Sequence, residues 1–148
     1  MKKKNRIGLV VLLMFFLIAV RAFLEPLFYD PLIDFYKSNY FLKPIPELNF
    51  VNYFFNIFLR YSLNSIVSII IIYLIYNNFK TIRFVIKFYF ISFIVLCILL
   101  YVFLQLEDLN TKLIIFYIRR FLIQPLFLFI LLPAFYYQKL KLAKENKN

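Results

Sequence analysis

The chain has 148 residues, of which 64% are hydrophobic and 22% aromatic, and its formal net charge is +11. This composition is typical of a polytopic membrane protein and leaves no room for a separate soluble domain. The basic residues lie at the borders of apolar segments, so no solvated basic face exists to bind nucleic acid. With no histidine, one cysteine and one glycine, the chain cannot build a His-based catalytic site, a Cys/His metal cluster or a glycine-rich phosphate loop. We therefore expect a protein that is not an enzyme and that holds no metal or cofactor.

The first apolar segment, residues 7–24, follows a basic N-terminus and has the layout of a signal peptide. No small-x-small cleavage site follows it, and Arg21 continues the segment with a charge. We therefore predict an uncleaved signal anchor that forms the first membrane helix. The segment is short for a span, so the Arg21 side chain is expected to reach outward to the interface.

Residues 25–50 form a loop that contains several prolines. Within it, Asp30 followed by Pro31 is the pattern of a helix N-cap and a first helical residue, and apolar residues then recur at helical spacing. The pattern predicts a short helix that lies in the outer interface of the membrane, with Asp30 as its cap.

Three further apolar segments, 51–76, 84–104 and 113–137, are each long enough to cross about 30 Å of hydrocarbon. Pro125 is expected to kink the last of them just after Gln124 and to turn a backbone carbonyl toward the polar residues described below. The predicted fold is therefore an all-α integral membrane protein. It is a four-transmembrane-helix bundle with a short interfacial helix in the first outer loop, and it forms a single membrane domain.

The distribution of basic residues predicts the orientation of the bundle. Placing both termini in the cytoplasm puts eleven bases on the inner side and three on the outer side, which satisfies the positive-inside rule. The three outer bases are Lys37, Lys43 and Lys112. The remaining four bases are arginines, and this topology places each of them in the outward third of the membrane. They are Arg21, Arg60, Arg119 and Arg120.

Two of these arginines are followed one helical turn later by an amide, as Arg60 with Asn64 and Arg120 with Gln124. An arginine and an amide at this spacing share a helical face, and together they suit a carboxylate or phosphate held from two sides. A charge at membrane depth costs on the order of 3 kcal/mol, so its presence favours a function. We predict an outward-facing anion site. Its residues are Arg21, Arg60, Asn64, Arg119, Arg120 and Gln124.

The alternative is a structural role, in which acids of the first outer loop neutralise the arginines and tie the loop to the bundle. Six of the seven acids fall on the same outer side as the arginines. Both roles can hold together, because three loop acids do not neutralise four arginines. The candidate charge partners are Glu25, Asp30 and Asp34.

Helical geometry limits how these charges can pair. Arg119 and Arg120 are adjacent, so their side chains point about 100° apart and cannot both face one acceptor. At least one of the two is therefore expected to lack a protein carboxylate. Because Asp30 is needed as the helix cap, we expect the partner of Arg60 or Arg120 to be one of the other two loop acids.

Five motifs spread along the chain carry a family resemblance. They are Arg21-Ala22-Phe23, Leu27-Phe28-Tyr29-Asp30-Pro31-Leu32, Arg60-Tyr61 with Leu63-Asn64-Ser65, Arg119-Arg120-Phe121-Leu122-Ile123-Gln124-Pro125 and Pro133-Ala134-Phe135-Tyr136-Tyr137-Gln138. With them the chain resembles the exosortase F system-associated proteins of flavobacteria over nearly its whole length. The resemblance implies a small protein of the bacterial inner membrane, encoded beside an exosortase. An exosortase is a membrane transpeptidase for carboxy-terminal sorting signals.

Two functions remain open. The resemblance implies a non-catalytic accessory protein that contacts the exosortase or its substrate's sorting signal, with the outer acids receiving the basic end of that signal. Exosortases resemble one another by a Cys, Arg and His set, which this chain cannot supply because it has no histidine and its only cysteine, Cys97, lies mid-span. The second function is that of a binder or carrier of an anionic lipid-linked group at the arginines. Membrane lipids are partners in either case.

Overall fold

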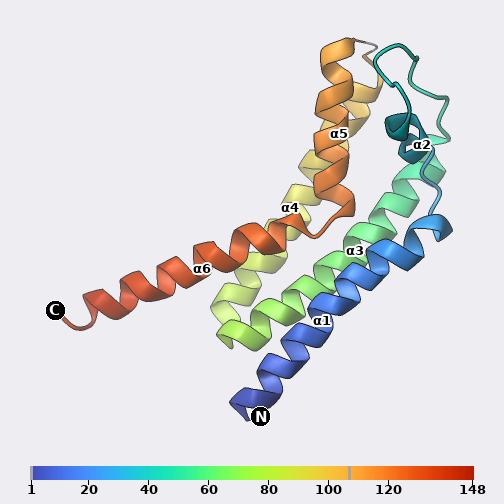
Figure 1. Ribbon diagram of the computed structural model, residues 1–148. Coiled ribbons are helices and arrows are strands. Elements are labelled where there is room, and N and C mark those ends of the chain that lie inside the picture. Colours follow the sequence, from blue (N-terminus) through green and yellow to red (C-terminus); the bar gives the residue numbers. More distant parts are fainter. Residues whose placement is uncertain (1, 107) are drawn as a thin grey trace.

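The computed structural model describes residues 2–106 and 108–148, and these residues contain helices and no strand (Figure 1). Four of the helices are long and apolar enough to cross a membrane, namely α1, α3, α4 and α6. This confirms the predicted all-α fold with four candidate membrane spans. In chain order the elements are α1 (Lys3–Leu24), the 3-10 helix η1 (Glu25–Leu27), α2 (Leu32–Lys37), α3 (Phe50–Tyr76), α4 (Phe79–Leu104), α5 (Leu109–Ile123) and α6 (Leu126–Glu145).

Helix α3 is the centre of the bundle. It contacts α1, α4, α5 and α6, and half of its most apolar stretch is buried, against at most 17% in the other candidate spans. Its fully buried side chains include Tyr53, Ile57 and Ile71. Many apolar side chains of the other helices lie on the outside, where hydrocarbon would cover them. Polar groups on the buried face of α3 therefore have to find their partners inside the protein.

Two asparagines build the turn between α3 and α4. Asn77 ends α3 in the left-handed conformation with φ 48°, which asparagine tolerates better than most residues. The side chain of Asn78 then accepts a hydrogen bond from the backbone N–H of Lys80 at 2.9 Å. This N-cap starts α4 at Phe79, five residues before the predicted start of that span.

The predicted span 113–137 is two helices that meet at a break. Gln124 is extended, with φ −115° and ψ 149°, because the ring of Pro125 disfavours the helical conformation in the residue before it. Helix α5 therefore ends at Ile123, and α6 begins at Leu126 and leaves at a sharp angle (Figure 1). We expected a kink within one continuous helix, whereas the helix is interrupted. The interruption separates the arginines, which lie on α5, from the apolar helix α6.

The short helix in the outer loop exists, but its predicted cap is wrong. Helix α2 has only six residues, Pro31 occupies its N-cap position, and no side chain makes a capping hydrogen bond. The Asp30 carboxylate is turned to other partners, described below. Leu32 and Phe35 are buried, so α2 is anchored to the bundle by its apolar side.

A buried lysine fastens the rest of this loop to α5. The Lys112 Nζ donates hydrogen bonds to the carbonyl oxygens of Tyr40, at 3.1 Å, and Lys43, at 2.6 Å. The Tyr36 hydroxyl donates to the Lys112 carbonyl at 2.7 Å, and burial raises the pKa of Tyr36, so the phenol keeps its proton. The base distribution predicts no more than an outer-side position for Lys112, whereas the structure buries this residue to 7% exposure.

Candidate functional site

A single carboxylate from the outer loop joins α3 to α5. The Arg60 Nη1 of α3 donates a hydrogen bond to the Asp30 Oδ2 at 3.2 Å. The Arg119 guanidinium of α5 binds the same carboxylate with two donors, Nε to Oδ1 at 3.3 Å and Nη2 to Oδ2. The side chains of Asp30, Arg60 and Arg119 are 3%, 7% and 8% exposed. This buried triad is a set of charge-assisted hydrogen bonds that fixes the loop on the bundle.

The observed pairing corrects the predicted one. Asp30 is the partner of Arg60, and among the described residues neither Glu25 nor Asp34 forms an ion pair. The physical reason lies in what each position offers to the carboxylate. As the N-cap of a six-residue helix, the Asp30 carboxylate would gain one weak interaction with the backbone. Two guanidinium groups instead give it several charge-assisted hydrogen bonds.

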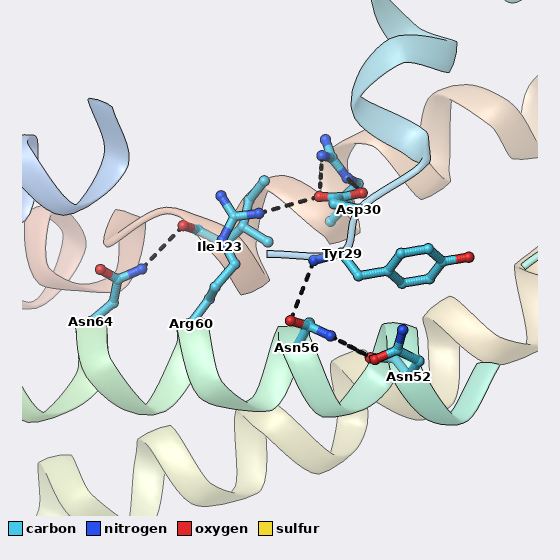
Figure 2. Close-up of polar contacts among 8 residues, drawn as sticks. Tyr29, Asp30, Asn52, Asn56, Arg60, Asn64 and Ile123 are labelled. Carbon is cyan, nitrogen blue, oxygen red and sulfur yellow. Dashed lines mark hydrogen bonds and ion pairs between the residues drawn. The ribbon is translucent and has the colours of Figure 1, made fainter. Parts of the chain in front are cut away.

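Arg60 and Asn64 lie on one side of α3, as their four-residue spacing predicted, and Asn56 extends this polar face by one turn. Figure 2 shows Asn56, Arg60 and Asn64 projecting from one side of this helix toward the outer loop and Ile123. The Asn56 Oδ1 accepts a hydrogen bond from the backbone N–H of Tyr29 at 3.3 Å. Asn64 Nδ2 donates to the carbonyl of Ile123, the last residue of α5, at 3.0 Å. The break thus turns a carbonyl toward this face, as expected, and Asn64 satisfies it.

The Arg60 guanidinium has a second kind of support. Its central carbon lies 5.3 Å from the centre of the Phe28 ring, within the range of a cation–π contact. Phe28 precedes Asp30 by two residues, so the same loop segment supplies both an aromatic face and a carboxylate to Arg60. These contacts make Arg60 a fixed part of the structure.

A cavity of about 300 Å³ lies beside the triad, and side chains from α1, η1, α2, α3 and α5 line it. Five of the six predicted site residues contribute to its wall. The exception is Asn64, which holds the end of α5 instead. The charged and amide residues of the wall are Arg21, Glu25, Lys37, Arg60, Arg119, Arg120 and Gln124.

Two arginines of this wall differ from the triad. Arg21 and Arg120 are exposed, and neither forms an ion pair within the part of the chain that the structure describes. The Arg120 Nε donates a hydrogen bond to the Gln124 Oε1 at 3.2 Å, so the two side chains lie on one side, as their spacing predicted. Of the adjacent pair on α5, Arg119 has the carboxylate and Arg120 has the amide.

We name the cavity beside the triad the arginine cavity. The positive and negative charges around it do not balance. Even if the exposed Lys37 is assigned to Asp34, which is three residues before it, four arginines remain. Against them stand the carboxylates of Glu25 and Asp30. The arrangement therefore keeps a formal excess of two positive charges.

The three predicted charge partners gather in a neighbouring cavity of about 410 Å³. Its wall includes Glu25, Asp30, Asp34 and Lys37, together with apolar residues of η1 and α2. The loop acids thus form a cluster of their own next to the arginines. Of these three acids, Asp30 alone forms an ion pair with residues that the structure describes.

The chemistry that these two cavities offer is recognition of charged groups. Among residues 2–106 and 108–148, no group of three or more His, Cys, Asp or Glu side chains could hold a metal ion. No protein-family model, curated protein or solved structure matches the chain. Function is therefore inferred from the geometry and charge of the cavities.

Proposed function

We propose that this protein is a non-catalytic membrane protein that binds the anionic headgroup of a lipid-linked molecule in the arginine cavity. The observation that carries the proposal is the pair Arg21 and Arg120, which line one cavity and have no carboxylate partner among the described residues. A bound phosphate or carboxylate offsets the cost of holding these charges near the membrane.

The size of the cavity supports a headgroup as the ligand. A volume of about 300 Å³ is at the lower end of the range for small-molecule pockets. It accommodates a phosphate or carboxylate with a few further atoms, and it is too small to enclose a lipid chain. Ile33, Phe116 and Ile123 form an apolar part of the wall, against which the first part of such a chain would pack.

The two exposed arginines and Gln124 form the contact surface for the ligand. Arginine presents its donors in a planar fork that matches the oxygens of a phosphate or carboxylate. The Gln124 Oε1 accepts from Arg120, which leaves the Gln124 amide nitrogen as a further donor for the ligand. Arg60 and Arg119 contribute positive potential from behind, since their hydrogen bonds go to Asp30.

A short-chain probe tests this proposal. Dodecyl phosphate, added to the purified protein in a neutral detergent, is expected to raise the temperature of unfolding. The double variant Arg21→Gln, Arg120→Gln is expected to bind the probe at least about tenfold more weakly, since each charged hydrogen bond contributes about 1.5 kcal/mol or more. The matched control is Arg83→Gln, Lys87→Gln, which removes two exposed bases of α4 that do not line the cavity.

Two further ligands identify the part of the probe that is recognised. Dodecanoate replaces the phosphate with a carboxylate, and inorganic phosphate lacks the chain. Stabilisation by dodecyl phosphate that is the same in the wild type and in the double arginine variant would show the proposal to be wrong. Equal stabilisation by inorganic phosphate would show that the ligand is soluble and that the lipid anchor is not recognised.

The second candidate function is the accessory role in an exosortase-type sorting system. The observation that favours it is the acidic cavity, where Glu25 and Asp34 sit at the predicted outer side and have no ion pair among the described residues. A sorting signal ends in basic residues, which this cavity would receive. Glu25→Gln with Asp34→Asn is expected to abolish co-purification with an exosortase. It is expected not to weaken dodecyl phosphate binding, because it removes only acidic charge from the surroundings of the arginine cavity.

We also propose that both termini face the cytoplasm of a bacterial cell and that the protein resides in the inner membrane. The support is the eleven-to-three distribution of bases. In a Cys97→Ser background, a cysteine introduced at Lys43 is expected to react with an impermeant thiol reagent added outside. One introduced at Asn78 is expected to stay unlabelled, and its labelling would reverse the orientation.

A further inference from the structure

A third cavity lies at the opposite end of the bundle, where α6 passes the turn between α3 and α4. Its volume is about 580 Å³, and it shares no residue with the arginine cavity. We propose that it holds one anionic phospholipid, with the phosphate at its lysines and an acyl chain along its aromatic wall. The residues that carry the argument are Tyr76, Lys80, Phe84, Phe135, Gln138 and Lys139.

We name this space the lysine cavity. The polar part of its wall is basic. Lys80 comes from the first turn of α4 and Lys139 from α6, so two helices present a charge to the same space. Among the described residues, no acid lines the cavity, and Thr81 and Gln138 add hydrogen-bonding groups. Lysines at a membrane border contribute about 1 kcal/mol each toward an anionic lipid surface. The charge complementarity therefore favours a phosphate group.

The apolar part of the wall favours a lipid over a soluble phosphate. Tyr76 and Phe135 meet edge to face with their ring centres 5.9 Å apart, and Phe84 meets Phe135 at 6.0 Å. Phe84 is 54% exposed and stacks on Phe88 at 6.3 Å, so the aromatic surface continues along α4. An acyl chain would cover this surface, whereas inorganic phosphate would leave it bare.

The position of α6 keeps the cavity open. The break at Pro125 lets α6 diverge from α5, and Figure 1 shows it running across the bundle away from the lower part of α1. The Tyr76 hydroxyl donates a hydrogen bond to the Leu132 carbonyl at 2.6 Å, which holds α6 to the end of α3. One wall of the cavity is thus fixed at a definite separation from the α3–α4 turn.

A fluorescence experiment reads this site alone. The chain has no tryptophan, so Leu142→Trp, at an exposed position in the wall of the cavity, supplies a single local reporter. The protein is reconstituted into vesicles that contain brominated phosphatidylglycerol or brominated phosphatidylcholine, whose bromines quench a neighbouring indole. Phosphatidylglycerol is expected to associate about thirty-fold more strongly. This factor corresponds to about 2 kcal/mol from two lysines, since about 1.4 kcal/mol changes an association constant tenfold.

Two double variants of the reporter protein test the cause of that preference. Lys80→Gln with Lys139→Gln is expected to remove the preference for phosphatidylglycerol. Lys141→Gln with Lys144→Gln removes the same charge from the same end of α6 outside the cavity wall, and it is expected to keep the preference. No difference between the two lipids, or an equal loss in both double variants, would overturn the proposal.

Inorganic phosphate separates a lipid site from a site for a soluble anion. At millimolar concentration it is expected to leave the quenching by brominated phosphatidylglycerol within about twofold of its original strength, because the acyl chain contributes apolar contact that the free ion lacks. Complete reversal of the quenching would identify a soluble phosphate as the ligand. Arg21→Gln with Arg120→Gln is expected to leave the reporter signal unchanged, since those residues line the other cavity.

Discussion

The four outer arginines divide into two pairs that differ in burial and in partner. Arg60 and Arg119 are buried and share the Asp30 carboxylate, which ties the loop to α3 and α5. Arg21 and Arg120 are exposed on the wall of the same cavity, and no described carboxylate pairs with them. Structural pairing, one of the two alternatives posed by the sequence, therefore applies to Arg60 and Arg119. The proposed anion site would use the other two arginines.

Because of this difference, the two pairs of arginines are expected to contribute to different properties, one to the stability of the fold and the other to ligand binding. A buried charge that loses its only partner is costly, because neither water nor another group replaces the contact. An exposed charge is hydrated, so its removal changes the folded protein little but removes a donor from any ligand. The first pair is therefore expected to respond to mutation through unfolding, and the second pair through binding.

The largest effect is expected for Asp30→Asn. The variant leaves two guanidinium groups buried without a carboxylate, which costs about 4 kcal/mol. Unfolding by SDS titration in mixed micelles measures the loss of stability. The matched control is Asp34→Asn, an exposed acid of the same loop that forms no ion pair with any residue the structure describes, with an expected change below about 0.5 kcal/mol. Equal effects of the two variants would contradict the division into buried and exposed pairs.

Lys112→Met is expected to release the outer loop while the triad stays intact. Methionine keeps the length of the side chain but removes the two hydrogen bonds to the carbonyls of Tyr40 and Lys43, and we expect a loss of about 2 kcal/mol. Hydrogen exchange should accelerate in residues 38–46 and remain slow in α3. Faster exchange throughout α3 would show that the lysine supports the whole bundle.

The features that sequence reasoning captured depend on spacing within one segment. The shared side of Arg60 and Asn64 on α3 follows from their spacing of four residues, and Arg120 and Gln124 lie close together at the same interval. Helix ends are harder to predict from the sequence. A proline shows where a helix cannot continue, but it does not give the angle at which the next helix begins. The sequence therefore predicted a kink at Pro125, where the structure has a break.

The features that sequence reasoning missed depend on contacts between distant segments. Asp30 lies 30 residues from Arg60 and 89 from Arg119, and local rules assigned it to the neighbouring helix instead. The predicted topology places Lys112 with the outer bases, but it does not reveal its hydrogen-bond partners, which lie 69 and 72 residues away. The lysine cavity requires the direction of α6, which only the observed break determines.

A smaller effect is expected for Asn64→Ala. The variant removes the donor to the Ile123 carbonyl, which then lacks a partner at the end of α5, and such a loss costs about 1.5 kcal/mol. The control is Asn52→Ala, an exposed amide on the same helix. SDS titration measures both variants. A loss below that of the control would show that the break between α5 and α6 needs no support from α3.

The smallest effect on stability is expected for Arg120→Gln, and it decides between the two roles of the cluster. Arg120 is exposed and contacts the Gln124 amide, so its removal should change the free energy of unfolding by less than about 0.5 kcal/mol. Arg119→Gln removes the same charge one residue earlier and should cost about 3 kcal/mol, because it breaks the bidentate contact to Asp30. If the two variants lose equal stability, Arg120 is a structural residue and the exposed pair does not exist as a separate functional unit. If Arg120→Gln keeps its stability and loses dodecyl phosphate, the same helix turn carries one arginine for the fold and its neighbour for the ligand.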